Sequence, residues 1–373
     1  MTEPPGTPQI DVGVLVAGGS SRRAGIDKRF LVIEGRTLLL RNLAFLRELF
    51  PRVAIVLGHD QDIDLGDARA DVILHDAWPT GSPLAGIATA LRHFHEPVFA
   101  LAVDIARPDR ESALRVLAAF PGHDAALPAI GGQFHQPLFA AYGPACLVPM
   151  AAVLDAGRHR IVHILPAVRT VEVPFPDEAR FRNINTMDDF REAQREARAQ
   201  GAPAAAAQPA LVAVVGKSDA GKTTLIEKLV PELVRLGLRV GTVKHDAHSF
   251  EIDHPGKDSW RHGRAGASAY AIASPERLAF ITRLDEELEL TAIARRFFAG
   301  FDLVVAEGYK RSAPHRVELF RAGAGHTEPL CAPGEALALV TDAELEHEHR
   351  FGLEDGAGLA RFLAVRLDAL REY

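Results

Sequence analysis

Short apolar runs alternate with amphipathic stretches through the first half of the chain. The apolar runs have the length and continuity of buried strands, and they lie at Val12–Ala17, Val53–Leu57, Val72–Leu74 and Val98–Val103. The stretches between them repeat apolar residues at helical spacing, at Leu38–Leu49, Leu84–His93 and Glu111–Ala119. Such alternation predicts an α/β domain in which helices cover both faces of a parallel sheet, as in Rossmann-like folds.

The apolar periodicity stops at Gln194–Pro209, where the chain becomes rich in Ala, Pro and Gln. This composition is typical of a linker between domains. The pattern then restarts, with strands predicted at Leu211–Val215, Arg239–Lys244 and Asp302–Ala306 and an amphipathic helix at Leu225–Leu236. We therefore predict two α/β domains, at residues 1–195 and 210–373, joined by an Ala/Pro-rich linker at residues 196–209.

The composition narrows the class of protein. A net charge of -7 gives no overall basic field, and no basic-aromatic pattern supports nucleic-acid binding. No apolar run is long enough for a transmembrane helix, and residues 1–11 lack the apolar segment of a signal peptide. Cys146 and Cys331 are the only cysteines, which suits a reducing compartment. We expect a cytoplasmic protein with neither nucleic acid nor membrane as a partner.

The lysines are few and unevenly placed. Only seven of the 42 basic residues are lysines. Lys228 has the setting of an ordinary helix-surface residue, whereas the other six lie in or beside glycine-containing or strand-end motifs: Lys28, Lys217, Lys222, Lys244, Lys257 and Lys310. Because an ammonium is a compact charge suited to phosphate oxygens, this placement predicts phosphate-binding lysines.

The first strand run ends in a glycine-rich loop, Val16-Ala17-Gly18-Gly19-Ser20-Ser21-Arg22-Arg23-Ala24-Gly25-Ile26-Asp27-Lys28. Glycines let backbone amides close around a phosphate, since no side chain blocks the approach. Arg23 adds a forked donor and Lys28 a point charge. The strand end and loop, from Val16 and Ala17 through Gly18 and Gly19 to Lys28, are therefore predicted to bind a nucleotide.

This loop resembles the LAGGxxxRMGxDK signature of the molybdenum cofactor guanylyltransferase (MobA-like) family, and the resemblance extends over most of residues 10–195. Asp76 and the segment Gly81–Gly86 resemble the Asp and GPLAG segments of that family, and Asp104 stands where its magnesium-binding Asp is expected. The segments Gln133–Leu138 and Asn183–Thr186 resemble its substrate-side segments.

The resemblance implies a reaction and a set of site residues. A phosphate oxygen of molybdopterin would attack the α-phosphorus of GTP, giving molybdopterin guanine dinucleotide and pyrophosphate. Positioning and charge neutralisation would supply the catalysis, without a protein nucleophile. Arg23, Lys28 and Asp104 would be catalytic, with Mg²⁺ at Asp104 and a nucleotide contact at Asp76. Substrate-side contacts would come from Gln136, Pro137, Asn183 and Asn185.

The sequence departs from that family's pattern after the fourth strand run. Where the family has D-x-P, this chain reads Asp104-Ile105-Ala106-Arg107-Pro108, and Leu57 and Gly58 stand where an Asn contact is common. Two alternatives to guanylyl transfer therefore stay open. One is cytidylyl transfer to the same cofactor, and the other is a GTP-dependent delivery adapter whose first domain is inactive.

The second half carries a P-loop, Gly216-Lys217-Ser218-Asp219-Ala220-Gly221-Lys222-Thr223, between a strand run and a helical pattern. In such a loop the backbone amides, from Gly216 to Thr224, cradle phosphates. Lys222 is predicted to bridge the β- and γ-oxygens, and the Thr223 hydroxyl to ligate Mg²⁺. A nucleotide site is thus predicted at Gly216, Gly221, Lys222, Thr223 and Thr224.

Residues 210–345 resemble the molybdopterin-guanine dinucleotide biosynthesis adapter (MobB-like) family of GTP-binding proteins. The matching segments are Gly221–Leu229, Val243–His245, Ile252–Ser259, Ala265–Ala267 and Glu307–Lys310. Glu307 ends a strand run like a Walker-B acid that could hold Mg²⁺. We interpret the nearby histidines, His245, His248, His254 and His262, as surface or anion-contacting residues more readily than as a metal site.

The whole chain thus resembles a fusion of a guanylyltransferase with a GTP-binding adapter. The resemblance implies GTP as both substrate and ligand, Mg²⁺ as cofactor, and molybdopterin cofactor as acceptor. It also implies molybdoenzymes or their chaperones as possible protein partners. A small-molecule kinase that uses the P-loop is a third alternative, but the sequence shows no clear acceptor base.

Overall fold

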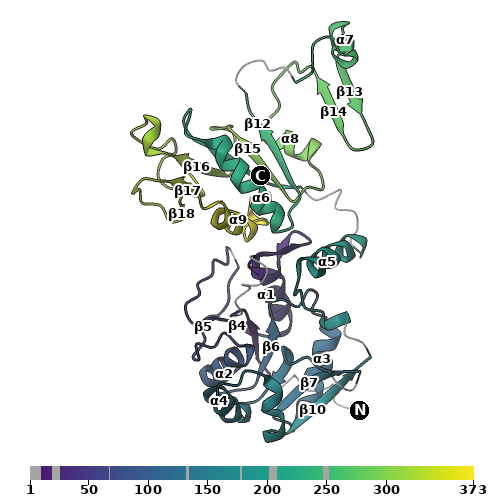
Figure 1. Ribbon diagram of the computed structural model, residues 1–373, viewed down its shortest axis with the longest axis vertical. Coiled ribbons are helices and arrows are strands. Elements are labelled where there is room, and N and C mark those ends of the chain that lie inside the picture. The colour runs from purple at the N-terminus through teal and green to yellow at the C-terminus, as the bar shows by residue number, and fades with distance from the viewer. Residues whose placement is uncertain are drawn as a thin grey trace, which may run out of the picture. The chain divides into compact units, whose positions relative to one another are not determined.

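The computed structural model describes residues 10–18, 26–66, 68–131, 134–176, 179–200, 208–246 and 252–373. The chain divides into two compact units, the first drawn chiefly from residues 1–203 and the second chiefly from residues 204–373 (Figure 1). Each unit has its own central sheet, and we describe each by itself. The domain boundaries at residues 195 and 210 stay predictions.

The first unit is built on a mostly parallel sheet in the order β10-β7-β9-β6-β1-β4-β5, with β8 paired to β7. Strand β9 runs antiparallel to both of its neighbours. The strands are β1 (Val12–Val16), β4 (Arg52–Leu57), β5 (Val72–His75), β6 (Val98–Ala102), β7 (Ala125–Ile130), β8 (Phe134–His135), β9 (Phe139–Tyr142) and β10 (Thr170–Phe175). A small hairpin, β2 (Val32–Ile33) and β3 (Arg36–Thr37), precedes the first long helix.

Helices cover both faces of this sheet, as the alternating pattern predicts. They are α1 (Leu38–Leu49), α2 (Pro83–Phe94), α3 (Arg110–Ala119), α4 (Leu147–Asp155) and α5 (Met187–Gln200). Successive residues of a strand point to opposite faces. In β1, Leu15 therefore joins the core under α1 and α3, while Val14 and Val16 join the core under α2 and α4.

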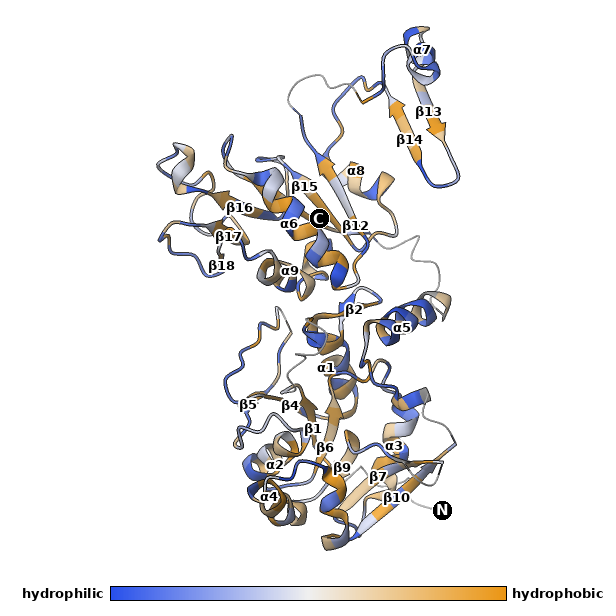
Figure 2. Cartoon of the chain, in the orientation of Figure 1, coloured by the Kyte–Doolittle hydropathy of each residue, from blue (hydrophilic) through white to orange (hydrophobic). Residues whose placement is uncertain are grey.

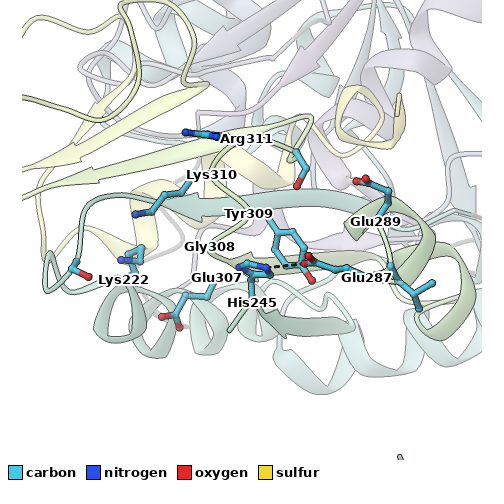
Figure 3. Close-up of a pocket in the computed structure, with 12 residues that line it drawn as sticks. Lys222, His245, Glu287, Glu289, Glu307, Gly308, Tyr309, Lys310 and Arg311 are labelled. Carbon is cyan, nitrogen blue, oxygen red and sulfur yellow. Dashed lines mark hydrogen bonds and ion pairs between the residues drawn. The ribbon is translucent and has the colours of Figure 1, made fainter. Parts of the chain in front are cut away.

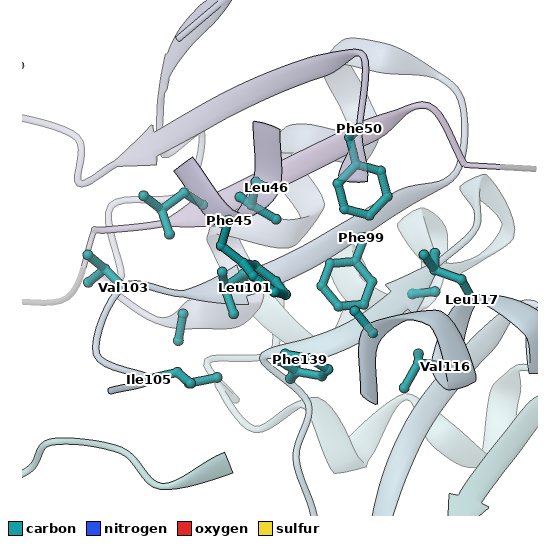
Figure 4. Close-up of a cluster of buried hydrophobic side chains, with 14 of the residues drawn as sticks. Phe45, Leu46, Phe50, Phe99, Leu101, Val103, Ile105, Val116, Leu117 and Phe139 are labelled. Carbon is teal, nitrogen blue, oxygen red and sulfur yellow. The ribbon is translucent and has the colours of Figure 1, made fainter. Parts of the chain in front are cut away.

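The core under α1 and α3 is rich in aromatic rings. Phe99 stacks on Phe50 with centroids 5.4 Å apart and meets Phe139 edge-on at 5.2 Å (Figure 4). Gly13 of β1 lies beneath this cluster, and a Cβ there would lie 2.7 Å from the Phe50 ring. The absence of a side chain at Gly13 therefore lets the end of α1 approach the sheet closely.

The predicted helix limits agree with the structure where a capping residue marks them. Helix α1 has the predicted limits, and the Thr37 hydroxyl caps it by accepting from the Leu40 N–H at 3.3 Å. Helix α5 differs, because it continues through Gln200 into the segment predicted as a linker. Ala193 and Ala197 are buried one turn apart there, so small residues supply an apolar face that the sequence pattern did not reveal.

The second unit is built on a parallel sheet in the order β12-β15-β11-β16-β17-β18. Its strands are β11 (Ala210–Val215), β12 (Val240–Lys244), β15 (Leu303–Glu307), β16 (Arg316–Phe320), β17 (Ala338–Thr341) and β18 (Arg350–Phe351). Its helices are α7 (Asp258–Arg264), α8 (Leu290–Phe297) and the first part of α6 (Lys222–Arg235). The end of α6, from Pro231, and nearly all of α9 (Gly356–Ala364) group with the first unit. A separate antiparallel hairpin, β13 (Ala269–Ala273) and β14 (Leu278–Thr282), lies outside this sheet.

Hydropathy follows the layers of each unit. Strand β11 is buried throughout, and β15 is buried from Leu303 to Ala306 and has the hydrophobic colour over most of its length in Figure 2. This continuous apolar character is expected of parallel strands that are covered on both faces. Within the part of the chain that the structure describes, none of the helices has the length and apolar character needed to cross a membrane.

Candidate functional site

The first site lies where β1 and β6 end. These strands are parallel neighbours, with Val16 opposite Ala102, so the segments that follow them emerge at the same edge of the sheet. Gly18 follows β1, and Asp104 follows β6. Both line a pocket of about 160 Å³, together with Lys28.

Lys28 joins the two strand ends to a distant segment. It begins a short 3₁₀ helix (Lys28–Phe30) that the Asp27 carboxylate caps. Its Nζ donates to Asp104 Oδ2 and to Asn185 Oδ1, each at 3.4 Å. The structure therefore brings together three predicted site residues, Lys28, Asp104 and Asn185, that are far apart in the sequence.

Asp76 is a buried acid at the same pocket. Its side chain is 3 % exposed, and Oδ1 has no hydrogen-bond partner within the described ranges of the chain. Burial raises the pKa of this carboxyl from 3.8 to about 6. A Cβ at Gly18 would lie 3.2 Å from Asp76 Oδ2 and 2.9 Å from the Gly58 nitrogen, so glycine keeps the approach to this acid open.

Asp104 has the character of a cation ligand. Burial raises its pKa, and the neighbouring Lys28 ammonium opposes that rise. Its carboxylate lines the pocket, and its backbone oxygen accepts from the Ile184 N–H at 2.8 Å. A carboxylate oxygen is a hard ligand of the kind that Mg²⁺ prefers, so Asp104 could hold such a cation.

Two of the predicted substrate-side residues, Gln136 and Asn183, are linked to each other and to the segment after Asp104. Gln136 is 5 % exposed, and its Nε2 donates to the Phe181 carbonyl at 3.1 Å and to Asn183 Oδ1 at 3.5 Å. Asn183 forms an isolated bridge with Ile105, next to Asp104. The Pro137 carbonyl accepts from the Tyr142 hydroxyl at 2.7 Å. Gln136 therefore helps to hold the Asn183 side chain.

Two predicted residues of this site, Gly19 and Arg23, lie outside the described residues. Ser82, from the predicted segment Gly81–Gly86, lines the pocket, and so does Arg29, which sequence reasoning missed. Arg29 is held by the Asp27 carboxylate and by Gln61 Oε1, the latter at 3.2 Å. Its place directly after Lys28 is the one sequence signal that could have drawn attention to it.

The second site is built on the P-loop between β11 and α6. A Cβ at Gly216 would lie 2.5 Å from the Leu319 carbonyl oxygen, and Gly221 has a φ of +100°, so the loop depends on glycine at both positions. Helix α6 begins at Lys222, which is followed by Thr223 and Thr224. The loop therefore presents its amides at a helix N-terminus, where anions are favoured.

The predicted magnesium-side residues, Thr223 in the first turn of α6 and Glu307 at the end of β15, lie in contact. The Thr223 hydroxyl lies 3.0 Å from both carboxylate oxygens of Glu307, the last residue of β15. The Lys222 ammonium folds back to donate to the Lys217 carbonyl at 2.9 Å. Burial and the nearby Lys310 charge lower the pKa of Lys222. A bound phosphate would oppose this lowering of the pKa, because its negative charge favours the protonated ammonium.

The pocket beside the P-loop has a volume of about 630 Å³ and extends past Glu307 (Figure 3). His245 lies in its middle, where its Nε2 is 2.8 Å from Glu287 Oε1 and its ring contacts Tyr309. Gly308 and Tyr309 both have positive φ angles, so the chain turns sharply directly after Glu307. This turn directs Tyr309 and Lys310 into the pocket.

The structure describes two of the three remaining histidines named in the sequence analysis. His254 and His262 are exposed, and His248 lies outside the described residues. Within the described ranges, the structure places no group of three or more His, Cys, Asp or Glu side chains where they could jointly hold a metal ion.

Comparison with known proteins matches both halves of the chain. Residues 13–170 match the model of the MobA-like NTP transferase domain, and residues 211–342 match that of molybdopterin guanine dinucleotide synthesis protein B. A probable molybdenum cofactor guanylyltransferase of Pelotomaculum thermopropionicum is 32% identical over 191 residues, covering 49% of this chain and 91% of the relative. A molybdopterin-guanine dinucleotide biosynthesis adapter protein of Escherichia coli is 38% identical over 158 residues, covering 41% of this chain and 90% of the relative.

The chain belongs to both families. Solved structures also match each half of this MobA–MobB fusion. A molybdopterin-guanine dinucleotide biosynthesis protein A from Archaeoglobus fulgidus covers 51% of the chain and all of its own length, at 23% identity and a TM-score of 0.45. A molybdopterin-guanine biosynthesis protein B covers 43% of the chain and 99% of its own length, at 33% identity and a TM-score of 0.33.

Family membership confirms the predicted fold class and enzyme class. The first half of the fusion is a nucleotidyltransferase with a Rossmann-like α/β fold, and the second is a P-loop domain of the MobB type. The fusion is a nucleotide-binding enzyme of molybdenum cofactor biosynthesis. The assignment of individual site residues stays a prediction that experiments must test.

Proposed function

We propose that the first domain transfers GMP from GTP to molybdopterin cofactor, forming molybdopterin guanine dinucleotide and releasing pyrophosphate. We further propose that the second domain binds GTP and serves as an adapter. The names of the relatives support this proposal, because guanylyltransferases match the first half and adapter proteins match the second. Transfer of the cofactor to molybdoenzymes or their chaperones would be the role of the adapter.

The observation that carries the proposal is the meeting of Lys28, Asp104 and Asn185 at the ends of β1 and β6. A phosphate oxygen of the acceptor attacks the α-phosphorus of GTP, and the bond from that phosphorus to the β-phosphate oxygen breaks. The electron pair of that bond leaves with pyrophosphate. Lys28 offsets the charge that develops on the phosphates, as Arg23 of the same loop would.

Mg²⁺ is the cofactor that the chemistry of both sites suits. Asp104 would hold it in the first domain, and Thr223 with Glu307 would hold it in the second. Bound there, it would neutralise phosphate charge. Asp104 and Glu307 each end or follow a strand beside a phosphate loop, and each offers hard oxygen ligands. Asp76 would bind the nucleotide from the floor of the first pocket.

The deciding experiment measures pyrophosphate release by the full chain with molybdopterin, Mg²⁺ and either GTP or CTP. Release with GTP is expected, and Asp104→Asn should lower the rate on the order of 10²–10³-fold. Asp188→Asn, which changes an exposed carboxylate of α5, is the matched control and should keep the rate. Release with CTP alone would retain the reaction class and refute the choice of base.

Pyrophosphate is the informative product because hydrolysis of GTP at the P-loop would release orthophosphate instead. A chain that binds GTP but releases no pyrophosphate with either nucleotide would refute the transferase and favour a delivery adapter. Lys222→Ala should leave pyrophosphate release intact, since the P-loop is not the site of transfer in this proposal.

A further inference from the structure

A buried amide holds the turn that carries Asp104. Asn42 lies on α1, and its Nδ2 is 3.3, 2.9 and 3.1 Å from the carbonyl oxygens of Ala102, Val103 and Ile105. These carbonyls stand on both sides of Asp104 in the chain. An amide nitrogen has only two hydrogens, so the three contacts share them. Asn42 therefore restrains the backbone before and after the carboxylate.

The same side chain carries a cost that packing alone does not offset. Asn42 is fully buried, and its Oδ1 has no hydrogen-bond partner anywhere in the described part of the chain. An unpaired buried polar atom is unfavourable, whereas a leucine of similar size would avoid it. The stabilising contribution of the Asn42 side chain must then come from its Nδ2, whose hydrogen bonds all go to carbonyls of the turn around Asp104.

The opposite side of the turn is held by backbone contacts. The Ile184 N–H donates to the Asp104 carbonyl at 2.8 Å, and the Ala106 N–H donates to the Arg182 carbonyl at 3.2 Å. These bonds tie the turn to the segment that carries Asn183 and Asn185. Without the amide of Asn42, the turn would keep only its backbone hydrogen bonds, from this segment and from the Val103 and Ile105 N–H groups, and the carboxylate could shift on its strand end.

We propose that Asn42 is a positioning residue for Asp104, and that it acts by fixing the turn that aims this carboxylate into the nucleotide pocket. The inference rests on the proposed function, because it treats Asp104 as the ligand of the catalytic cation. Asn42 itself contacts neither substrate nor cation. It would control how well Asp104 binds a divalent ion beside the phosphates of GTP.

The test compares Asn42→Leu with Leu46→Val in the full chain. Leu46 is fully buried one turn further along α1, and it contributes to the core without bonding to the turn. Both variants remove interactions from the same helix, so both are expected to lower the unfolding midpoint in urea. Only Asn42→Leu removes the donor that faces the three carbonyls.

Three readouts separate positioning from stability. Binding of Mn²⁺ in the presence of GTP, followed by electron paramagnetic resonance, should weaken about 10–100-fold in Asn42→Leu and stay near wild type in Leu46→Val. Amide hydrogen exchange of residues 103–107 should accelerate only in Asn42→Leu. The kcat for pyrophosphate release should fall by a similar factor, with the KM for GTP changed less than about threefold.

The readouts also keep this inference apart from the proposed function. Equal Mn²⁺ affinity and equal exchange of residues 103–107 in the two variants would overturn the role of Asn42. If the wild-type chain released no pyrophosphate, the transferase would be refuted, but Mn²⁺ binding and hydrogen exchange would still decide whether Asn42 positions Asp104. If Asn42→Leu failed to fold, Asn42→Ser, which keeps a hydroxyl donor, would take its place with a smaller expected loss.

Discussion

Replacing Asp76 by asparagine should make the first unit more stable at neutral pH while it impairs nucleotide binding. The carboxyl of Asp76 is buried and its Oδ1 lacks a hydrogen-bond partner within the described residues, so the ionised form is costly. Asparagine has nearly the same shape and carries no charge. The substitution therefore removes the buried charge without creating a cavity.

The magnitude follows from the pKa. Burial raises the pKa of Asp76 from 3.8 to about 6, which is a difference of about two pH units. Each unit corresponds to about 1.4 kcal/mol, so the buried charge costs the folded state roughly 3 kcal/mol at pH 8. Because the pKa of Asp76 is higher in the folded state, ionisation of this group costs the folded state nothing below about pH 4. The folded state then loses stability as the pH rises through 6. At pH 4.5 the cost is about 1 kcal/mol.

The assay is urea unfolding at pH 4.5 and pH 8, followed by tryptophan fluorescence. The chain has two tryptophans, one in each half, and Trp78 packs against the core of the first unit. A Trp260→Phe background makes Trp78 the only reporter, so the measurement follows the first unit alone. Asp60→Asn, whose carboxylate is 95% exposed, is the control that should show no such gain.

The quantity to compare is the gain of Asp76→Asn over wild type at the two pH values. Any cost of the new amide that does not depend on pH cancels from that difference. We expect the gain at pH 8 to exceed the gain at pH 4.5 by about 2 kcal/mol. An equal effect at both pH values would refute the reasoning, since Asp76 would then not be a buried titrating acid. If Asp76→Asn also bound GTP more weakly, the stability lost to the buried charge would be linked to nucleotide binding.

Three further substitutions test the second unit. Gly216→Ala should abolish GTP binding at the P-loop, because its Cβ would lie 2.5 Å from the Leu319 carbonyl oxygen; calorimetry should then find one GTP site per chain in place of two. Lys222→Ala should likewise reduce the number of GTP sites from two to one, while the melting temperature of the protein stays at the wild-type value. A lowered melting temperature would show that Lys222 also stabilises the fold. Glu318→Gln should destabilise the unit by about 1–3 kcal/mol in thermal unfolding, because this buried carboxylate accepts from two backbone amides at residues 330–331; no change would show that the amides find other acceptors.

The parts of the fold that the sequence predicts are those with strong local signals. Strands β1, β4 and β6 are continuous apolar runs, and β11 precedes a P-loop, so length and pattern suffice to find them. The antiparallel strand β9 carries no such signal. Its apolar residues, Phe139–Tyr142, form a run too short to tell from a loop. Its place between β6 and β7 depends on pairing across distant segments.

Site residues divide in the same way. Lys28 and Lys222 lie inside loops with recognisable spacing, so the sequence singles them out. Asn42 cannot be singled out in this way, because an isolated Asn within a helical pattern carries no local signal for function. Its role depends on the packing of α1 against the end of β6, which brings its nitrogen within 2.9 Å of the Val103 carbonyl. Such contacts follow from tertiary structure, and only the fold reveals them.

The structure shows where the few lysines lie, and their role as phosphate-binding residues stays a prediction. Lys28 reaches into the first pocket, whereas Lys222 and Lys310 line the second. Lys228 instead pairs with Glu354 on an exposed surface, as an ordinary helix residue does. Arginine serves nearly everywhere else because surface ion pairs accept either cation. At a phosphate the compact ammonium can sit among backbone amides where a planar guanidinium would not fit, so a chain that favours arginine keeps lysine at these positions. Lys217, Lys244 and Lys257 do not line either pocket, so a glycine or a strand end nearby is not sufficient to mark such a site.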